Sequence, residues 1–312
     1  MEQEKISKKL FIFNIVLIIA VVFMTFVLYQ SSLQKQSKRV VKAEIETKSL
    51  AVFENVNVKA KAVMVYDMAD DRILYAKNEG AQLPLASITK LMTALVATEL
   101  LPKNSNVTIK SEFLREEGDS GLLVSESWNL KELLDFSLVT SSNDGMRSVA
   151  SVIGATKLDS QDYDLGRKDF IEKMNKRAKE LGLDQTFFVN ESGLDVGSVS
   201  GGYGSANDVN SLMKFMIISQ PEIMEATKYP ILSIDSDSKK HLAKNTNDII
   251  NSIPGLFASK TGFTDLAGGN LVVAFDPSLG KPIIITVLGS TQEGRFEDVK
   301  MLVNATLDYL NQ

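Results

Sequence analysis

The order of the predicted elements indicates an α/β (α+β) domain built on a largely antiparallel sheet. Two strands open the globular part, at Ala62–Asp67 and Arg72–Ala76, on either side of a short turn. Helical patterns fill the middle of the chain, and two more strands and a last helix close it. A block of helices between two groups of strands favours layered packing in which the strands pair mostly antiparallel.

Apolar spacing and end signals place the helices and the late strands. Leu130–Val152 is predicted to be helical with an interruption near residues 141–145. A helix at Asp169–Leu181 ends at Gly182, because glycine is the usual residue after a helix C-terminus. The other predicted elements are helices at about Ser87–Leu100, Ala206–Ile218 and Glu297–Leu310, and strands at Gly269–Phe275 and Pro282–Leu288.

The N-terminal segment, residues 1–29, predicts a transmembrane anchor. Leu10–Tyr29 is apolar apart from one Asn and one Thr, and as a helix it would be about 30 Å long, enough to span a bilayer. A cleaved signal peptide is the alternative, but Val27–Gln30 offers no small-x-small cleavage site. Basic residues on both sides of the span leave its orientation undecided by charge.

Composition narrows what the rest of the chain can do. Residues 30–57 are polar and predict a tether, and residues 58–312 predict the globular domain. A net charge of −5 argues against nucleic acid as a partner, since phosphate binding needs clustered Lys and Arg. The chain has no cysteine, which excludes disulfides, thiolate zinc sites and a Cys nucleophile.

The single histidine, His241, limits the available chemistry further. A Ser-His-Asp triad could use only His241, and a two-histidine metal site within the chain is excluded. His241 lies in a polar, basic stretch, Ser238–Lys244. We therefore expect an ordinary surface or loop histidine.

Ser87 and Lys90 form the first candidate catalytic pair, at the start of a predicted helix. Residues at i and i+3 share a helical face, so the Lys90 amine can reach the Ser87 hydroxyl. A serine needs a base to become a good nucleophile, and a desolvated, neutral lysine can supply one. A serine N-cap beside a solvated lysine is the alternative, because Ser-x-x-Lys is a weak motif by itself.

Two further motifs strengthen this interpretation. Ser141 and Asn143 interrupt a helical segment, where they can point into a cleft or form an ordinary polar turn. Lys260-Thr261-Gly262 stands just before the first late strand or begins it. A lysine and a hydroxyl suit a carboxylate there, and a glycine lets a ligand lie against a strand; an exposed turn is the alternative.

The ordered set Ser-x-x-Lys, Ser-x-Asn and Lys-Thr-Gly is typical of penicillin-recognising serine enzymes. More closely, the sequence resembles the D-Ala-D-Ala carboxypeptidase family of low-molecular-mass penicillin-binding proteins, peptidase family S11. The resemblance covers the whole globular part. The stretches that carry it are Leu83–Ala94, Leu133–Leu134 with Ser141–Asp144, Asn190–Asp195, Ser205–Val209 and Lys260–Thr264.

The resemblance implies a β-lactamase/transpeptidase-like fold, in which a mostly antiparallel sheet flanked by helices faces an all-helical lobe. It also implies that Ser87 is the nucleophile and Lys90 its base. Ser141 would relay a proton to the leaving D-alanine, and Asn143 would bind the peptide amide.

The same resemblance implies how the substrate is held. Lys260 and Thr261 would bind the terminal carboxylate, with Lys260 also helping to keep Lys90 neutral. Gly262 lies between them and Phe263, whose backbone N–H would form the oxyanion hole with that of Ser87. No metal or organic cofactor is implied.

The implied partners are a peptidoglycan stem peptide ending in D-Ala-D-Ala, and β-lactams as covalent inhibitors. With the N-terminal helix in the membrane, the protein would be a single-pass cell-membrane protein with its catalytic domain on the extracytoplasmic side. The sequence departs from the family pattern at Gly145, where alanine is usual, and at Ala258–Ser259. It also ends after the last predicted helix, and the N-terminal span would replace the C-terminal anchor of many relatives.

Three other functions stay open. A DD-endopeptidase would use the same motifs. A β-lactamase would too, but no Glu-x-x-Leu-Asn stretch between Asn143 and Lys260 supplies a deacylation base. A cell-wall-binding protein with an idle cleft is the non-enzymatic alternative.

Overall fold

The computed structural model describes residues 23–32, 52–118 and 121–311. Residues 23–32 are helical, and Phe53–Gln312 forms one compact unit, which is described below. The anchor predicted at residues 1–29 and the tether at residues 30–57 lie largely outside the described residues. Within the described ranges, no helix is both long and apolar enough to cross a bilayer.

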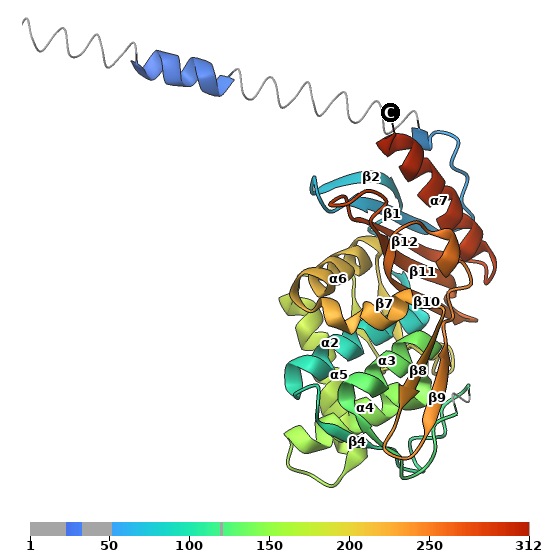
Figure 1. The fold of residues 1–312 in the computed structure, drawn as a ribbon. Coiled ribbons are helices and arrows are strands. Elements are labelled where there is room, and N and C mark those ends of the chain that lie inside the picture. The colour runs from blue at the N-terminus through green and yellow to red at the C-terminus, as the bar shows by residue number, and fades with distance from the viewer. Residues whose placement is uncertain (1–22, 33–51, 119–120, 312) are drawn as a thin grey trace, which may run out of the picture. The chain divides into compact units, whose positions relative to one another are not determined.

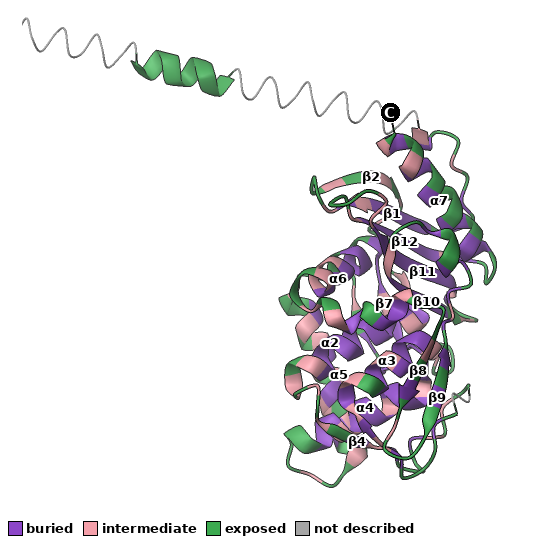
Figure 2. Cartoon of the chain, viewed as in Figure 1, coloured by how far each residue is buried: buried purple, intermediate pink, exposed green. Residues whose placement is uncertain are grey.

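A five-stranded antiparallel sheet forms one layer of the compact unit, with the strand order β10-β11-β12-β1-β2 (Figure 1). Its middle strands are buried along almost their whole length, so the sheet is covered on both faces (Figure 2). The strands are β1 (Ala62–Asp67), β2 (Arg72–Lys77), β10 (Leu256–Thr264), β11 (Gly268–Phe275) and β12 (Ile283–Ser290).

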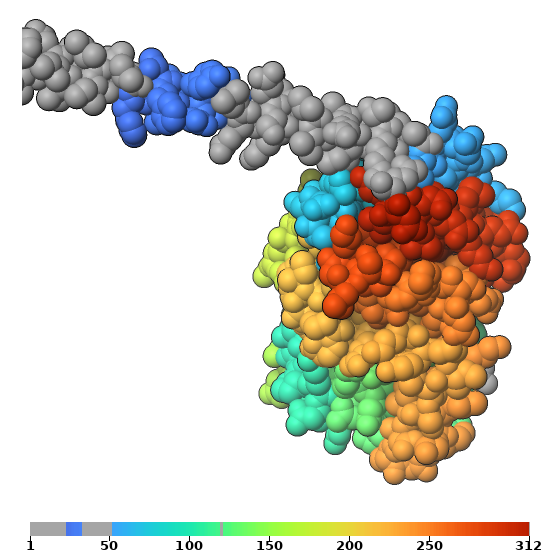
Figure 3. Space-filling model, turned by 45° about the horizontal axis from the view of Figure 1, so that its top comes forward, coloured from blue at the N-terminus to red at the C-terminus, as the bar shows by residue number. Residues whose placement is uncertain are grey.

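Two helices cover the sheet from opposite sides. Helix α6 (Ala206–Ser219) packs on β1 and β12, and helix α7 (Gly294–Leu310) packs on the other face (Figure 1). The start of the unit lies beside α7 (Figure 3). There the Asp298 carboxylate accepts hydrogen bonds from the backbone N–H groups of Lys59 and Ala60, both at 2.9 Å. This contact joins the first strand to the last helix.

A helical lobe follows the first two strands and packs around an apolar core that includes Leu95, Leu134 and Phe170. Its helices are α2 (Lys90–Leu100), α3 (Leu130–Thr140), α4 (Asn143–Lys157) and α5 (Tyr163–Glu180). Short 3-10 turns, η1 (Ala86–Thr89), η2 (Pro221–Ile223), η3 (Glu225–Lys228) and η4 (Ile250–Ser252), connect the parts. Three small sheets complete the unit. In the first, β7 (Gly202–Gly204) lies between β3 (Leu83–Pro84) and β6 (Phe187–Phe188). The other two pair β4 (Asn106–Thr108) with β5 (Ser127–Asn129), and β8 (Ile231–Asp235) with β9 (Lys240–Lys244).

The helices and strands predicted within the globular domain are all present, but one important strand was missed. Lys260-Thr261-Gly262 does not precede the late strands; it lies in the middle of β10, which is buried from Ala258 to Gly262. Because both faces of this strand are covered, its polar residues point inward and the usual alternation of apolar and polar residues is absent. The predicted helix at Asp169–Leu181 also begins earlier, at Tyr163, where the Asp162 side chain caps it by accepting from Leu165 N at 2.9 Å.

His241 is not a surface or loop residue, which corrects the expectation from its polar neighbours. It lies on β9 with its side chain inward and 5% exposed. Its Nε2 atom is 2.8 Å from Glu126 Oε1, and its ring centroid is 4.8 Å from that of Trp128. The partner carboxylate is distant in the sequence, so the local sequence around His241 contains no sign of this buried pair.

Trp128 packs where β5 meets α3 and β9, and its replacement tests this packing. It is fully buried and lies against Phe136 and His241. We expect Trp128→Ala to lower the free energy of unfolding of the full chain by about 3–5 kcal/mol, because a large cavity would remain. Chemical denaturation measures this. Leu242→Ala is the matched control, since its side chain is 72% exposed on the same strand as His241; an equal loss there would contradict the assignment.

Candidate active site

Ser87 lies in the short η1 turn between β3 and α2, where the sheet meets the helical lobe. The preceding residue, Ala86, adopts a left-handed backbone with φ of 49° although it is not a glycine. Such conformations are strained and concentrate at functional sites. The strain is maintained by close packing, because Gly193 lies so near that a Cβ there would be 1.9 Å from the Ala86 carbonyl oxygen.

The Lys90 amine is surrounded by three hydrogen-bonding partners. Its Nζ atom lies 2.8 Å from Ser87 Oγ, 2.7 Å from Asn143 Oδ1 and 2.7 Å from the Ser192 carbonyl oxygen. A neutral amine has two N–H donors and one lone pair. Two of the three partners can only accept, so in the neutral form the lone pair is left for the Ser87 hydroxyl proton. This geometry suits a base that removes the proton of Ser87.

Burial brings the neutral form of the Lys90 amine, which this role requires, within reach of neutral pH. The side chain is fully buried, and burial lowers its pKa from 10.5 to about 7. The negative charges of Glu191 and Glu116 oppose this lowering. The expected help of the Lys260 charge in keeping Lys90 neutral stays a prediction.

Ser141 and Asn143 lie where the sequence predicts a helix break. Helix α3 ends at Ser141, which has a left-handed backbone with φ of 61°, and α4 begins at Asn143. The Asn143 side chain links two parts of the site, since Oδ1 accepts from Lys90 and Nδ2 donates to the Glu117 carbonyl oxygen at 2.6 Å. The break therefore places the Asn143 side chain against Lys90 and the Ser141 hydroxyl within reach of Lys260.

Lys260 projects from β10 toward Ser141 rather than toward Lys90. Its Nζ atom donates to Ser141 Oγ at 2.9 Å and to the Thr261 carbonyl oxygen at 2.9 Å. Burial and the positive charges of Lys90 and Arg295 hold the pKa of Lys260 well below its usual value. The Thr261 hydroxyl contacts that of Thr246 at 2.6 Å. An anion that entered here would relieve the electrostatic repulsion within this buried cationic group.

Gly262 lets β10 approach the nucleophile. A Cβ at this position would lie 2.8 Å from the Leu85 carbonyl oxygen and 3.2 Å from Ser87 N, so a side chain does not fit without movement. The next residue, Phe263, is partly exposed. This contact brings the backbone of residues 262–263 against that of Ser87, as a pair of oxyanion-binding N–H groups requires.

Several residues around this centre could not be recognised from the sequence. Arg295, at the start of α7, donates to the Gly262 carbonyl oxygen at 2.8 Å and adds positive charge near Lys260. The Asn270 side chain donates to the carbonyl oxygens of Pro84 and Leu85, both at 3.0 Å, and so fixes the approach to η1. Their partners are far away in the sequence, so spacing alone does not reveal them.

The loop Asn190–Asp195, one of the stretches that resemble the family, holds part of the site in place. It forms a tight turn in which Asn190 Oδ1 accepts from Gly193 N at 2.7 Å. Asp195 at its end accepts from Thr264 Oγ1 at 3.1 Å, which ties the loop to β10. Through the Ser192 carbonyl oxygen, this loop supplies one of the two acceptors that orient Lys90.

The two departures from the family pattern are accommodated by local packing. At Gly145, a Cβ would lie 2.0 Å from Ser137 Oγ, so the serine hydroxyl occupies the space that an alanine methyl group would need. Ser259 donates from its backbone N–H to Thr227 Oγ1 at 3.0 Å and fastens β10 to η3. Neither residue contacts Ser87 or Lys90.

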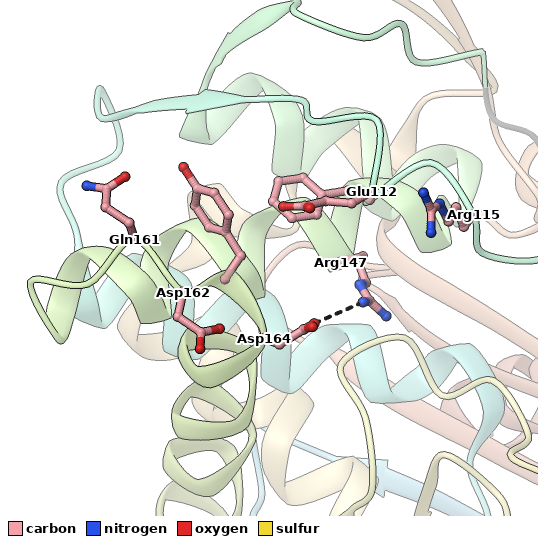
Figure 4. A pocket seen from close by; sticks show the side chains of 8 residues that line it. Glu112, Arg115, Arg147, Gln161, Asp162 and Asp164 are labelled. Carbon is pink, nitrogen blue, oxygen red and sulfur yellow. Dashed lines mark hydrogen bonds and ion pairs between the residues drawn. The ribbon is translucent and has the colours of Figure 1, made fainter.

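A separate cavity lies near the start of α5 (Figure 4). It encloses about 510 Å³ and includes Arg115, Arg147 and Tyr163 in its lining, but none of the candidate site residues. Arg147 connects the cavity to the site indirectly. Its guanidinium pairs with Glu116 at 2.7 Å, and the charge of Glu116 raises the pKa of Lys90. Within residues 23–32, 52–118 and 121–311, no cluster of three or more acidic or histidine side chains is arranged to hold a metal ion.

Comparison with known proteins places this geometry in a family. A sequence profile for D-alanyl-D-alanine carboxypeptidases, Peptidase S11, matches residues 47–292. D-alanyl-D-alanine carboxypeptidase DacF of Bacillus subtilis is 30% identical over 80% of this chain, which spans only 63% of that relative. A D-alanyl-D-alanine endopeptidase of Pseudomonas aeruginosa is 31% identical over 68% of the chain and 66% of its own length.

Solved structures confirm the predicted fold class. Penicillin-binding protein D2 from Listeria monocytogenes, in its ampicillin-bound form, is 31% identical and superposes with a TM-score of 0.68 over 81% of this chain and 99% of its own. The DD-transpeptidase of Streptomyces K15 shares the fold, with a TM-score of 0.73 at 24% identity over 81% of this chain and 99% of its own. The antiparallel sheet with a helical lobe is therefore the transpeptidase-like fold that the resemblance implied.

Burying Lys90 has a measurable effect on stability. Unfolding returns its pKa from about 7 to about 10.5, so between these values the unfolded chain binds an extra proton and stability rises with pH. We expect the free energy of unfolding of the wild type, relative to Lys90→Met, to rise by about 1.4 kcal/mol per pH unit in that window. Denaturation at several pH values measures it. The exposed Lys300→Met should show no such dependence; a flat Lys90 difference would contradict a neutral buried amine.

Proposed function

Because the chain belongs to the D-alanyl-D-alanine carboxypeptidase family, we propose that it removes the terminal D-alanine from peptidoglycan stem peptides. The observation that carries this proposal is the position of Lys90 Nζ within hydrogen-bonding distance of Ser87 Oγ, at 2.8 Å, in a fully buried setting. A serine with an adjacent neutral base is the minimal requirement for acyl transfer without histidine.

The first half of the reaction follows from the contacts around Lys90. The neutral amine takes the Ser87 hydroxyl proton as Oγ attacks the carbonyl carbon of the penultimate D-alanine. The resulting oxyanion is bound by the backbone N–H groups of Ser87 and Phe263. When the C–N bond breaks, the protonated Lys90 returns its proton through Ser141 to the leaving amine, so Lys90 is neutral again and an ester on Ser87 remains.

The second half regenerates the enzyme. Water attacks the ester carbonyl carbon while Lys90 accepts a proton, and the Ser87 alcohol leaves with the proton returned to its oxygen. Lys260, Thr261 and Arg295 provide the positive charge and hydroxyl group that suit the free carboxylate of a D-alanyl terminus. Asn143, held between Lys90 and the Glu117 carbonyl oxygen, would bind the substrate amide, and its side-chain amide beside Lys90 supports this role.

Endopeptidase action on cross-links is the second candidate function. Three of the similar proteins are named D-alanyl-D-alanine endopeptidases, and they match this chain at 28–31% identity. The same Ser87 centre would serve both reactions, so the two differ in which D-alanyl bond the cleft admits. A β-lactamase is less well supported, because the chain lacks the Glu-x-x-Leu-Asn stretch between Asn143 and Lys260.

Labelled penicillin and defined peptides test the function. We expect the full chain to form a long-lived adduct on Ser87 with a fluorescent penicillin, and to release D-alanine from a pentapeptide ending in D-Ala-D-Ala. Ser87→Ala should abolish both, because no other group can form the acyl-enzyme. Mass spectrometry of the adduct and an assay of free D-alanine provide the readouts.

The controls for this experiment separate the alternatives. Ser278→Ala, an exposed serine after β11, should behave as the wild type. Cleavage of a cross-linked dimer without release of terminal D-alanine would instead favour the endopeptidase. Rapid penicillin turnover would favour the lactamase, and no adduct at all would favour an idle binding protein.

We also propose that residues 1–29 anchor the protein in the cell membrane, with the catalytic domain on the extracytoplasmic side. The apolar stretch Leu10–Tyr29 and the extracytoplasmic position of peptidoglycan support this. The full chain should stay with membranes after washing at high pH, and protease added to intact protoplasts should digest the domain. A chain lacking residues 1–29 should be released; its retention would contradict an N-terminal anchor.

A further inference from the structure

Two oxygen atoms orient the Lys90 amine toward Ser87, and each is held in place by its surroundings. One is Asn143 Oδ1 at the start of α4, and the other is the backbone carbonyl oxygen of Ser192. The Ser192 oxygen belongs to the backbone, so no substitution at Ser192 removes it. Its position depends on how the neighbouring residues hold the loop. The residue before it, Glu191, is held on both sides.

The Glu191 side chain is a fully buried carboxylate that meets an arginine from α5. Both of its oxygens accept from Arg167 Nε, at 2.8 and 3.0 Å. Burying a carboxylate is costly unless a charged partner and hydrogen bonds compensate for the lost water. Arg167 reaches this position from a helix with its own side chain still a quarter exposed.

The backbone of Glu191 is tied to the helix that carries the base. Its carbonyl oxygen accepts from Thr93 Oγ1 at 2.7 Å, and Thr93 lies on α2 one turn after Lys90. The segment is therefore held by α5 through a side chain and by α2 through its backbone. The next carbonyl group, that of Ser192, contacts Lys90 directly.

We propose that Arg167 is a positioning residue for the Lys90 amine: it neutralises the buried Glu191 carboxylate and fixes the loop whose Ser192 carbonyl oxygen orients that amine. The inference rests on the proposed function, since it takes Lys90 to be the base. Arg167 does not contact the reacting atoms and acts through Glu191 and Ser192.

The charges around Lys90 give the direction of the expected effect. The Glu191 and Glu116 carboxylates raise the pKa of Lys90 against the lowering by burial. Removing the positive charge of Arg167 leaves the field of Glu191 uncompensated, so Lys90 would hold its proton to higher pH. The other charged groups on the surrounding elements, which the variants leave unchanged, are Asp144 and Arg147 on α4, Asp195 in the loop, Lys260 on β10 and Arg295 on α7.

The test measures acylation of the full chain by a fluorescent penicillin as a function of pH. We expect Arg167→Met to move the acid limb of the wild-type profile to higher pH by roughly one unit, about a tenfold loss below neutral pH with little loss above it. Glu191→Gln should move the limb to lower pH. The double variant Arg167→Met/Glu191→Gln should return it toward the wild type, and Arg167→Lys should keep it near the wild-type position.

A matched control is available on the same two helices. Arg177 on α5 pairs with Glu99 on α2 at 2.8 Å, and its side chain is 23% exposed, compared with 25% for Arg167. Arg177→Met should leave the limb unmoved. An unshifted limb in Arg167→Met, or a shift that persists unchanged in the double variant, would overturn the proposal.

The experiment distinguishes a failure of the role of Arg167 from a failure of the proposed function. If Arg167→Met does not fold, Glu191→Gln carries the test, because an unmoved limb in that variant would itself refute the inference. If the wild type is acylated but releases no D-alanine from a pentapeptide, the proposed function fails. The acylation profiles of the variants still decide the role of Arg167 in that case.

Discussion

The site depends on one physical constraint, which is that an amine must be buried without becoming charged. Lys90 lies on the buried side of α2 with no exposed surface, and removal from water lowers its pKa to about 7. The loss of hydration is compensated only if each N–H group and the lone pair of the neutral amine have a hydrogen-bonding partner. Ser87 Oγ, Asn143 Oδ1 and the Ser192 carbonyl oxygen use them, so these three groups must converge from η1, α4 and a loop.

That convergence explains the backbone strain around the site. Ala86 and Ser141 both adopt left-handed conformations that non-glycine residues avoid, and both lie beside a residue of the centre. Close contacts hold Ala86 there, because Gly193 packs on the Ala86 carbonyl group and Gly262 packs on the backbone of Leu85 and Ser87. A side chain at Gly262 would push η1 away from β10, and one at Gly193 would push η1 away from the loop Asn190–Asp195.

The sequence was sufficient to predict the candidate residues but not the way they are held. Ser87 and Lys90 are three positions apart on a helical turn, so local spacing predicts their contact. The place of Lys260 inside β10 could not be read locally, since a strand buried on both faces carries inward polar residues. His241 with Glu126, and Glu191 with Arg167, are pairs between distant segments. In the sequence, each member of these pairs is indistinguishable from an ordinary charged surface residue, because its partner is far away along the chain.

The electrostatic design of the site follows from these distant pairs. Glu116 and Glu191 are the two carboxylates whose charge raises the pKa of Lys90, and each meets an arginine, Arg147 at 2.7 Å and Arg167 at 2.8 Å. The same two acidic residues lie in or beside the segments that supply the oxygen atoms orienting Lys90. A carboxylate at these positions fastens a loop to a helix, but it also favours the protonated lysine. Pairing each carboxylate with an arginine keeps this attachment and limits how far the negative charge raises the pKa of Lys90, which lies at about 7.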